Sequence, residues 1–380
     1  MEFMLTENQK AVQELARNFA EKEMRPVVMK YDESQEFPFE IVQKLAGLGF
    51  MGMTVPDELG GAGLNELDAI VITEELAKVD PSVALTVASH NSLCTGHLML
   101  HASEAQKKKY VPDLASGRSL GAWGLTEPGS GSDSGGMRTL ATRDGSDWII
   151  NGSKSFITQG SVGSIYVVMA VTDRSKDKAN ISAFILEKGM KGFTVGKKEN
   201  KLGMRSSDTS TLIFDSVRVP AENVIGTLGD GFRQALSVLD GGRIGIAALS
   251  VGIAQAALDA SVTYAKERRQ FGKPIAEFQA IQWKLGDMAT EINAARLLTQ
   301  RAAWLRMTGQ PITLASAEAK YFASEAAVRA TGEAVQIHGG YGFIKDFPVE
   351  KLYRDARLMT IGEGTSEVQK MVISRTVLSI

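Results

Sequence analysis

Apolar and polar positions follow different periods along the chain, and the changes of period divide it into three parts. In the first part, Thr6 and Gln9 have the spacing of a helix-capping box, and apolar residues follow at helical spacing. Ser103 and Gln106 repeat this spacing before a Lys-rich segment. The stretch Ser82–Ala102 is apolar but contains three histidines, which favours a buried helix over a membrane span.

Short β-branched runs and turn residues replace the helical pattern between positions 119 and 219. The pair Asn151-Gly152 follows the apolar run Trp148-Ile149-Ile150, and such a pair is typical of a type I′ hairpin turn. Three further runs predict strands: Ile165–Val171, Ile181–Leu186 and Thr211–Phe214. This part of the chain therefore predicts an all-β domain.

Long segments rich in Ala, Leu and Gln return after Gly226 and predict a second helical domain. The predicted helices are Phe232–Arg268, Ile275–Met307, Leu314–Ile337, Phe347–Ile361 and Val368–Leu378. The order of the parts predicts an α+β multidomain protein. Its expected parts are an N-terminal all-α domain at 1–118, a central β-barrel-like domain at 119–226 and a C-terminal four-helix-bundle domain at 227–380.

Composition narrows the class of protein. The 42 basic and 44 acidic side chains give a formal net charge of −2, which argues against a nucleic-acid partner. The single cysteine, Cys94, excludes an intrachain disulfide and a Cys-based zinc cluster. No segment has the pattern of a targeting peptide or a membrane span. We therefore expect a cytoplasmic bacterial protein, or a mitochondrial-matrix protein if the chain is a mature eukaryotic form, without a nucleic-acid or membrane partner.

The histidines provide only a weak signal for a metal site. His97 and His101 lie one helical turn apart and Glu104 follows, as in a metal triad. However, Ser103 is predicted to cap the next helix, so we expect Glu104 to point elsewhere and the imidazoles to be structural. We expect no metal. The glycine-rich fingerprints of Rossmann and P-loop nucleotide sites are absent from the sequence.

Two loops carry stronger candidate chemistry. The segment Trp123–Asp133 is rich in Gly, Ser and Thr, so it is either a surface loop or a cradle for a polar heterocycle or pyrophosphate. Glu363 lies between two glycines, and Ser366 with Gln369 is interpreted as a capping box that starts a helix. A carboxylate placed there can act as a general base, or it can be a solvated residue that the helix dipole favours.

Together these segments resemble the acyl-CoA dehydrogenase family, and the resemblance covers the whole chain. The motifs that carry it are Trp123–Asp133, Gln336–Gly342, Arg354–Ala356 and Glu363–Glu367. The resemblance implies FAD as cofactor, an acyl-CoA thioester as substrate and α,β-dehydrogenation to the trans-2-enoyl-CoA. It also implies a homotetramer that passes electrons to electron-transfer flavoprotein.

The resemblance assigns roles to individual residues. It implies that Glu363 removes the α-proton while a hydride leaves the β-carbon for flavin N5, and burial should raise the pKa of Glu363. The residues implied to contact the flavin are Trp123, Leu125, Thr126, Phe156 and Thr158. Those implied to hold the ADP half are Arg268, Gln270, Phe271, Gln336 and Gly340 from a neighbouring subunit, together with Thr365 and Glu367. Those implied to contact substrate are Ser132, Asp240 and Arg243 for CoA, and Leu93 and Gly362 for the acyl chain.

Two glycines bear on the base and the substrate. Some family members carry the catalytic Glu at the helix position of Gly242, so its absence here leaves Glu363 as the matched base. Many straight-chain members have Tyr where this chain has Gly362, which opens space beside the reacting carbons. We expect a short- or medium-chain substrate, and a branched or cyclic acyl group also fits. No Arg lies between positions 79 and 101, which disfavours a dicarboxylic substrate.

Other members of the same superfamily remain alternatives. An acyl-CoA oxidase is disfavoured because such chains are typically much longer. A DNA-associated flavoprotein would need a basic face, which the net charge disfavours. A member without turnover is disfavoured by the presence of Glu363.

Overall fold

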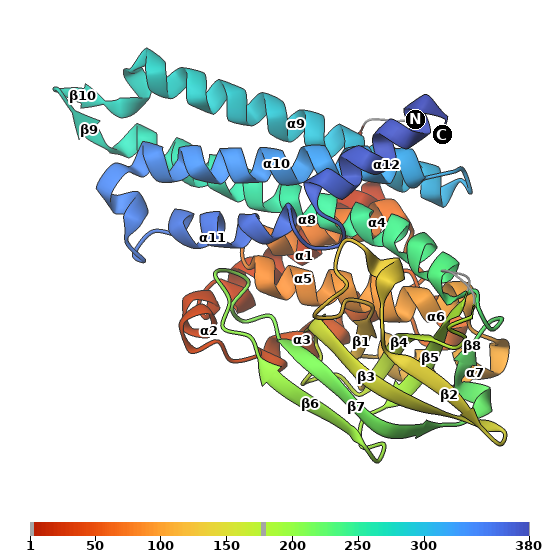
Figure 1. Ribbon diagram of the computed structural model, residues 1–380. Coiled ribbons are helices and arrows are strands. Elements are labelled where there is room, and N and C mark those ends of the chain that lie inside the picture. The colour runs from red at the N-terminus through yellow and green to blue at the C-terminus, as the bar shows by residue number, and fades with distance from the viewer. Residues whose placement is uncertain (1–3, 176–179, 380) are drawn as a thin grey trace.

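The computed structural model describes residues 4–175 and 180–379, which form three parts in chain order. Helices at both ends of the chain pack side by side, and the sheet lies against one end of this assembly (Figure 1). The order of the parts confirms the predicted fold class.

The N-terminal part contains short helices that follow one another closely. Its elements are α1 (Glu7–Phe19), η1 (Ala20–Met24), α2 (Val28–Ser34), α3 (Phe39–Gly47), η2 (Phe50–Gly52), η3 (Asp57–Leu59), α4 (Glu66–Ala77), α5 (Pro81–Ser89), η4 (His90–Thr95), α6 (Gly96–His101) and α7 (Glu104–Ala115). Both predicted capping boxes are confirmed, because Thr6 with Gln9 and Ser103 with Gln106 exchange reciprocal hydrogen bonds. The predicted buried helix at 82–102 contains a π-helical segment, η4, between α5 and α6.

The middle part is one sheet. Its strands are β1 (Gly121–Gly124), β2 (Leu140–Asp144), β3 (Asp147–Thr158), β4 (Ile165–Val171), β5 (Ile181–Glu187), β6 (Phe193–Lys198), β7 (Thr209–Val219) and β8 (Val224–Ile225). The described pairings run in the order β6-β7-β3-β2-β4-β5-β8, with β1 beside β4. Short 3-10 turns, η5 (Ser134–Gly136) and η7 (Ala221–Asn223), join some of them. The three predicted strand runs all lie in strands of this sheet.

The predicted hairpin turn at Asn151-Gly152 is wrong. These residues lie inside β3, and the turn between β2 and β3 falls at residues 145–146, where Gly145 has a φ of +62°. Gly152 instead marks a register shift against β7 and has a φ of +143°. A Cβ there would lie 2.6 Å from Thr139 Oγ1. The glycine is therefore used for close approach of two chain segments, and pairing along the long strand overrides the local turn preference.

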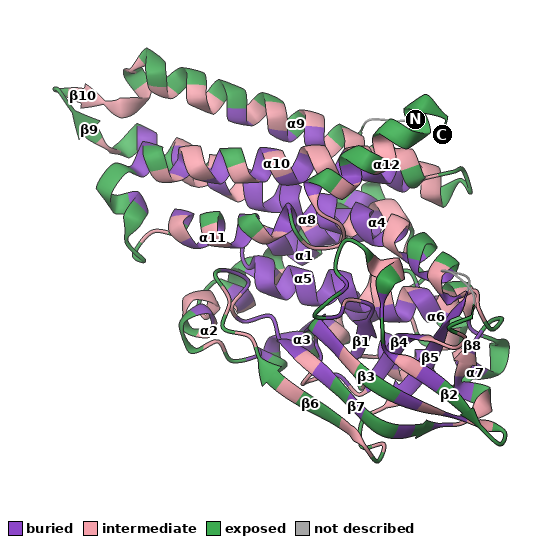
Figure 2. Ribbon diagram, viewed as in Figure 1, coloured by how far each residue is buried: buried purple, intermediate pink, exposed green. Residues whose placement is uncertain are grey.

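The C-terminal part is built around one long helix. Its elements are α8 (Gly231–Glu267), β9 (Arg269–Gln270), β10 (Lys273–Pro274), η8 (Ile275–Glu277), α9 (Gln279–Met307), α10 (Thr313–His338), η9 (Gly339–Phe343), α11 (Val349–Met359) and α12 (Ser366–Leu378). α8 packs against α9, α10 and α11 and against α4 and α5 of the N-terminal part. Buried residues concentrate in α8, α4 and α5 (Figure 2). α8 is long and apolar enough to cross a membrane, but 67% of its most apolar window is buried inside the protein, as in a core helix.

Buried ionic contacts join the three parts. Lys351 on α11 pairs with Asp80, which precedes α5, at 3.0 Å and with Asp355 at 2.6 Å. Asp355 also accepts a hydrogen bond from the backbone N–H of Met204 in the middle part. Arg354, the preceding residue, pairs with Asp32 of α2 at 2.8 Å. The segment that matched a family motif is therefore a link between domains.

Candidate active site

The centre of the site is the loop between α11 and α12. Glu363 and Gly364 both have left-handed backbones, with φ of +52° and +93°. Helix α12 starts at Ser366 as predicted, but the predicted capping box is wrong, because Thr365 is the residue that caps it and accepts from the N–H of Val368. The hydroxyl of Ser366 donates to Glu325 on α10.

Gln369 also has a different role from the predicted one. Its side-chain amide donates to the carbonyl oxygens of Glu363, at 3.3 Å, and Gly364, at 2.9 Å. The side chain of Ser366 thus makes a tertiary contact to α10, and the side chain of Gln369 stabilises the loop before α12. A pattern of spacing could not distinguish these partners from the backbone N–H groups of a cap.

The carboxylate of Glu363 lies against α8 and the π-helical segment. Its Oε2 atom is shielded from solvent and has no hydrogen-bond partner among the described residues. A Cβ at Gly242 would lie 2.2 Å from this atom and 3.2 Å from Cδ2 of Leu93. Two predicted site residues, Leu93 and Glu363, therefore meet beside Gly242. Because only glycine at 242 leaves room, the carboxylate can occupy the position close to this helix.

Burial controls the protonation of this carboxylate. It raises the pKa of Glu363 to about 7, although the positive charges of Lys320 and Arg243 act in the opposite direction. The sequence analysis also predicted that burial raises the pKa of Glu363. A carboxyl group with such a pKa is half ionised near neutral pH, so it can both accept and return a proton there.

Arg243, which is buried, and Asp240, which is half-buried, form an ion pair beside the loop. Their side chains approach to 2.6 Å, and Asp240 also accepts from the hydroxyl of Thr313 at 2.6 Å. The Nε atom of Arg243 is buried without a hydrogen-bond partner among the described residues. A Cβ at Gly241 would meet the guanidinium of Arg306, so this turn of α8 is crowded with cations. Gly362, by contrast, is open: a Cβ there would make only ordinary contacts, no closer than 3.7 Å.

A second group of predicted residues lies where β1 and β3 approach each other. The carbonyl of Thr126 accepts from the backbone N–H of Ser155 at 2.8 Å, which ties the loop after β1 to β3. Phe156 has a φ of +57° and its side chain is 67% exposed. Thr126 and Thr158 are partly exposed, whereas Trp123 and Leu125 are buried. An uncovered aromatic ring and two hydroxyl groups thus lie on neighbouring segments.

A buried ion pair connects the loop after β1 to strand β3. Lys154 on β3 approaches Glu127 to 2.8 Å, and Glu127 accepts from the backbone N–H groups of Arg138 and Thr139. Ser132, the predicted CoA contact, is exposed in this loop.

Both ring nitrogens of His97 are engaged, one with Trp123 and one with Gln234. No group of three potential metal ligands occurs within residues 4–175 and 180–379.

The predicted residues at the β9–β10 hairpin lie away from Glu363 in this chain. Arg268, Gln270 and Phe271 are at the β9–β10 hairpin, at the far tip of α8 and α9 (Figure 1). Phe271 is 94% exposed. The other predicted ADP contacts are Gln336 in the last turn of α10, Gly340 in η9, and Thr365 and Glu367 at the start of α12 beside Glu363. The resemblance placed Arg268, Gln270, Phe271, Gln336 and Gly340 on a neighbouring subunit, and that assignment stays a prediction.

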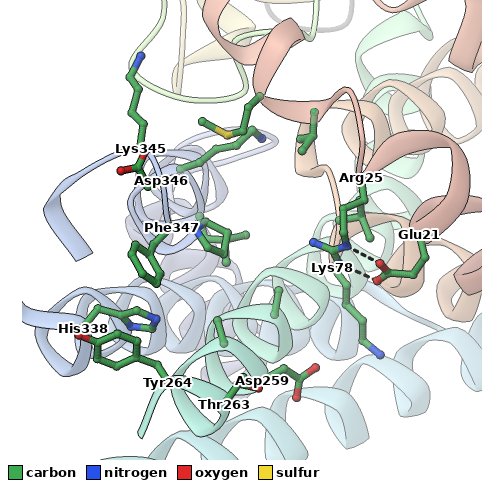
Figure 3. A pocket seen from close by; sticks show the side chains of 18 of the residues that line it. Glu21, Arg25, Lys78, Asp259, Thr263, Tyr264, His338, Lys345, Asp346 and Phe347 are labelled. Atoms are coloured by element: carbon green, nitrogen blue, oxygen red, sulfur yellow. Dashed lines mark hydrogen bonds and ion pairs between the residues drawn. The ribbon is translucent and has the colours of Figure 1, made fainter. Parts of the chain in front are cut away.

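A separate cleft of about 540 Å³ lies between the N-terminal helices and the far ends of α8 and α10. Tyr264 and His338 stack in it at 4.3 Å, and Glu21 pairs with Arg25 across from them (Figure 3). It contains none of the predicted site residues.

Lys320 is a residue of the site that the sequence analysis missed. Its side chain is fully buried on α10, and its ammonium group donates to the carbonyl of Gly364 at 2.6 Å. The sequence contains a pattern that indicates its burial. Small residues such as Ser316, Ala323 and Ala327 lie at helical spacing from Lys320 and place it on the inner face of the helix.

Comparison with known proteins defines the class. Three family models match consecutive parts of the chain: the N-terminal domain of acyl-CoA dehydrogenase at 6–118, its middle domain at 122–217 and its C-terminal domain at 229–378. The chain therefore belongs to the acyl-CoA dehydrogenase family and is an oxidoreductase. Within the family it is close to the short-chain and butyryl-CoA dehydrogenases.

Individual relatives cover the whole chain. The short-chain-specific acyl-CoA dehydrogenase of Clostridium acetobutylicum is 48% identical over 374 residues, 98% of this chain and 99% of that protein. The structure of butyryl-CoA dehydrogenase from Megasphaera elsdenii superposes with a TM-score of 0.98, at 46% identity and 100% coverage of both chains.

Two further relatives concern the partner and the cofactor. A subunit of the caffeyl-CoA reductase–Etf complex of Acetobacterium woodii is 45% identical over 374 residues, 98% of this chain and 99% of that protein. The structure of a glutaryl-CoA dehydrogenase from Mycobacterium smegmatis in complex with FADH2 superposes with a TM-score of 0.94, at 30% identity, covering 99% of this chain and 96% of that one.

Proposed function

We propose that this protein is an FAD-dependent dehydrogenase of short acyl-CoA thioesters in which Glu363 removes the α-proton. The observation that carries the proposal is the shielded Oε2 atom of Glu363, which has no hydrogen-bond partner among the described residues and faces the gap left by Gly242. A buried carboxylate without a partner is costly, so a group that meets it during the reaction is expected.

The protein's part in the proposed reaction is the control of one proton. The α-hydrogen of a thioester is weakly acidic, so its removal needs an aligned base. Burial makes the carboxylate of Glu363 a stronger base than an exposed one, since it raises its pKa to about 7. The left-handed backbone of Glu363 directs the side chain toward α8, and Gly242 allows it to approach.

The residues present fit an FAD. An aromatic ring held at a left-handed position and left 67% exposed, as in Phe156, is expected where another planar group covers it. Phe156, Thr126, Thr158, Trp123 and Leu125 would hold the flavin. Bound FAD would supply the acceptor for the hydride from the β-carbon.

The remaining predicted contacts are assigned in the same proposal. The ADP half would be held by Arg268, Gln270, Phe271, Gln336 and Gly340 from a neighbouring chain of a homotetramer, together with Thr365 and Glu367. The 94% exposure of Phe271 supports this assignment, because so large an apolar side chain is expected to be covered in an assembly. Domain boundaries at 118/119 and 226/227 belong to the same proposal.

The proposed substrate is a short acyl-CoA. Leu93 is close enough to Gly242 to limit the space beside the reacting carbons, whereas the open position at Gly362 leaves room for a branch. Arg243, Asp240 and Ser132 would contact CoA. The names of the relatives, short-chain-specific and butyryl-CoA dehydrogenases, support a short chain. Electron-transferring flavoprotein is the proposed electron acceptor. The name of a relative, a subunit of a caffeyl-CoA reductase–Etf complex, supports this flavoprotein as a partner.

The test is an anaerobic titration of the purified holoenzyme with straight, branched and cyclic acyl-CoA thioesters, followed by the loss of flavin absorbance. We expect short chains to bleach the wild type, and Glu363→Gln to retain flavin but bleach at least about 100-fold more slowly, the usual contribution of a general base. Glu14→Gln on the exposed face of α1 is the control. Bleaching of Glu363→Gln at the wild-type rate would overturn the assignment of the base.

A further inference from the structure

Lys320 is a buried cation that contacts no carboxylate among the residues that the structure describes. Its side chain is 0% exposed, and the described part of the chain contains no carboxylate within ion-pair distance of it. Its hydrogen bond is to a neutral acceptor, the carbonyl of Gly364. Burying an ammonium group this way is expensive, so its presence needs a reason beyond packing.

The carbonyl that Lys320 holds belongs to the left-handed loop. A left-handed backbone is strained at a non-glycine residue, so the conformation of Glu363 persists only if its surroundings hold it. Two side chains do so: Gln369, from the helix that follows the loop, and Lys320, from α10. Lys320 is thus the donor that anchors the Gly364 carbonyl to a different element.

The charge of Lys320 also acts on the carboxylate of Glu363. The other charged groups that face this region are Arg243 with its partner Asp240 on α8, Glu325 on α10 and Glu367 on α12. Burial lowers the pKa of Lys320 to about 8, so the ammonium form still predominates at neutral pH. Burial raises the pKa of Glu363, and the positive charge of Lys320 opposes this effect more strongly than that of Arg243 does.

We propose that Lys320 is a positioning residue of the dehydrogenation, which holds the backbone of Glu363 through the Gly364 carbonyl and favours the ionised carboxylate through its charge. This inference rests on the proposed function, in which Glu363 is the base. It assigns two separable roles to one side chain, a hydrogen-bond donor and a positive charge.

Three variants separate the two roles. Lys320→Met removes both the donor and the charge with little change of volume. Lys320→Gln removes the charge but keeps a donor, and it carries the test if the Met variant does not fold. Gln369→Met is the matched control, because it removes donors to the same loop and leaves the charge in place.

The measurement is the pH dependence of kcat/KM for the best acyl-CoA, with the ionisation of Glu363 followed independently by infrared difference spectroscopy. The carboxyl band of Glu363 is identified by its loss in Glu363→Gln. Removing a nearby positive charge disfavours the carboxylate, so the acid limb should move to higher pH in both Lys320 variants. A rise of about one pH unit lowers the ionised fraction at pH 7, and with it kcat/KM, roughly fivefold.

The Gln369→Met variant should lose activity at all pH values without moving the acid limb. A wild-type pH profile and an unchanged infrared titration in both Lys320 variants would overturn the proposal. Different results would contradict the assignment of Glu363 as the base and the proposed role of Lys320. If Glu363→Gln remains active, the assignment of the base is wrong, whereas an inactive Glu363→Gln with unchanged Lys320 profiles overturns only the role of Lys320.

Discussion

At the scale of single residues, Glu363 combines a strained backbone with a shielded carboxylate. Both features come from neighbours outside the loop: Gly242 leaves the space, and Lys320 and Gln369 hold the loop. Strain of this kind is typical of functional positions, where the surrounding structure over-determines an unfavourable conformation.

The pKa of Glu363 predicts how activity depends on pH. Burial raises it to about 7, and the proposed base works only when ionised. Activity should therefore be low below this value, rise about tenfold per pH unit on the acid limb and level off above it. The pH dependence of kcat/KM checks this prediction, because it reports the ionisation of groups in the free enzyme. An acid limb near pH 4.5, the usual value for a glutamate, would contradict the shielded environment.

Gly242→Ala tests the contact between α8 and the carboxylate. The added methyl group would lie 2.2 Å from Oε2, so the carboxylate must move away. We expect kcat to fall by about 100-fold, since a displacement of about 1 Å can have this effect. Gly245→Ala on the same helix is the control, because its Cβ would make only an ordinary contact of 3.7 Å with Ala88. Equal activities of the two variants would show that this approach is unimportant.

At the scale of elements, β3 shows how a strand overrides a local turn signal. The Asn-Gly pair predicts a turn, yet β3 continues through it because it pairs with β2 and β7 along its length. Strands β4 and β5 were predicted correctly, since both of their faces are buried and they form continuous apolar runs.

Gly152→Ala and Gly145→Ala compare a crowded and an open glycine of the same hairpin. Both positions have positive φ, but a Cβ at 152 would lie 2.6 Å from Thr139 Oγ1, whereas a Cβ at 145 would meet nothing within 4 Å among the described residues. We expect a loss of about 1 kcal/mol for Gly145→Ala and about 2–4 kcal/mol for Gly152→Ala, from backbone strain and overpacking. Denaturant unfolding checks the order, and equal losses would contradict the close approach.

At the scale of the whole molecule, the buried cluster around Lys351 connects all three parts. Asp80 comes from the N-terminal part, Asp355 from the C-terminal part, and the N–H of Met204 from the middle part. Leu93 comes from the N-terminal part and Glu363 from the C-terminal part, so the candidate site forms only when these two parts are held together.

Lys351→Met should destabilise the protein by about 3–5 kcal/mol, because it leaves two buried carboxylates without a counter-charge. Lys345→Met is the control. Lys345 pairs with Glu33 at the surface, where an ion pair contributes at most about 1 kcal/mol. Urea unfolding of both variants measures the loss in the free energy of unfolding. A loss in Lys351→Met no greater than that in Lys345→Met would contradict the role of the cluster.

The predictable part of this protein is the part that depends on local chemistry. Helical spacing and caps such as Thr6 with Gln9 are read from neighbouring residues, and the α-β-α order follows from them. The family motifs are short runs of sequence, and they point to Glu363 and to Gly242 by themselves. By contrast, Ser366 and Gln369 have the spacing of a cap but bond elsewhere, since their partners come from α10 and from the loop.

The sequence by itself determined most of the helices, the strands β4 and β5, the α-β-α order and the candidate carboxylate, because these depend on periodicity and on residues a few positions apart. Only the tertiary structure decided the environment of that carboxylate. The shielding of Glu363, its pKa of about 7 and the burial of Lys320 arise where α8, α10 and the loop before α12 meet. Desolvation and buried charge depend on the distances between segments far apart in the chain, and no local pattern of residues contains those distances.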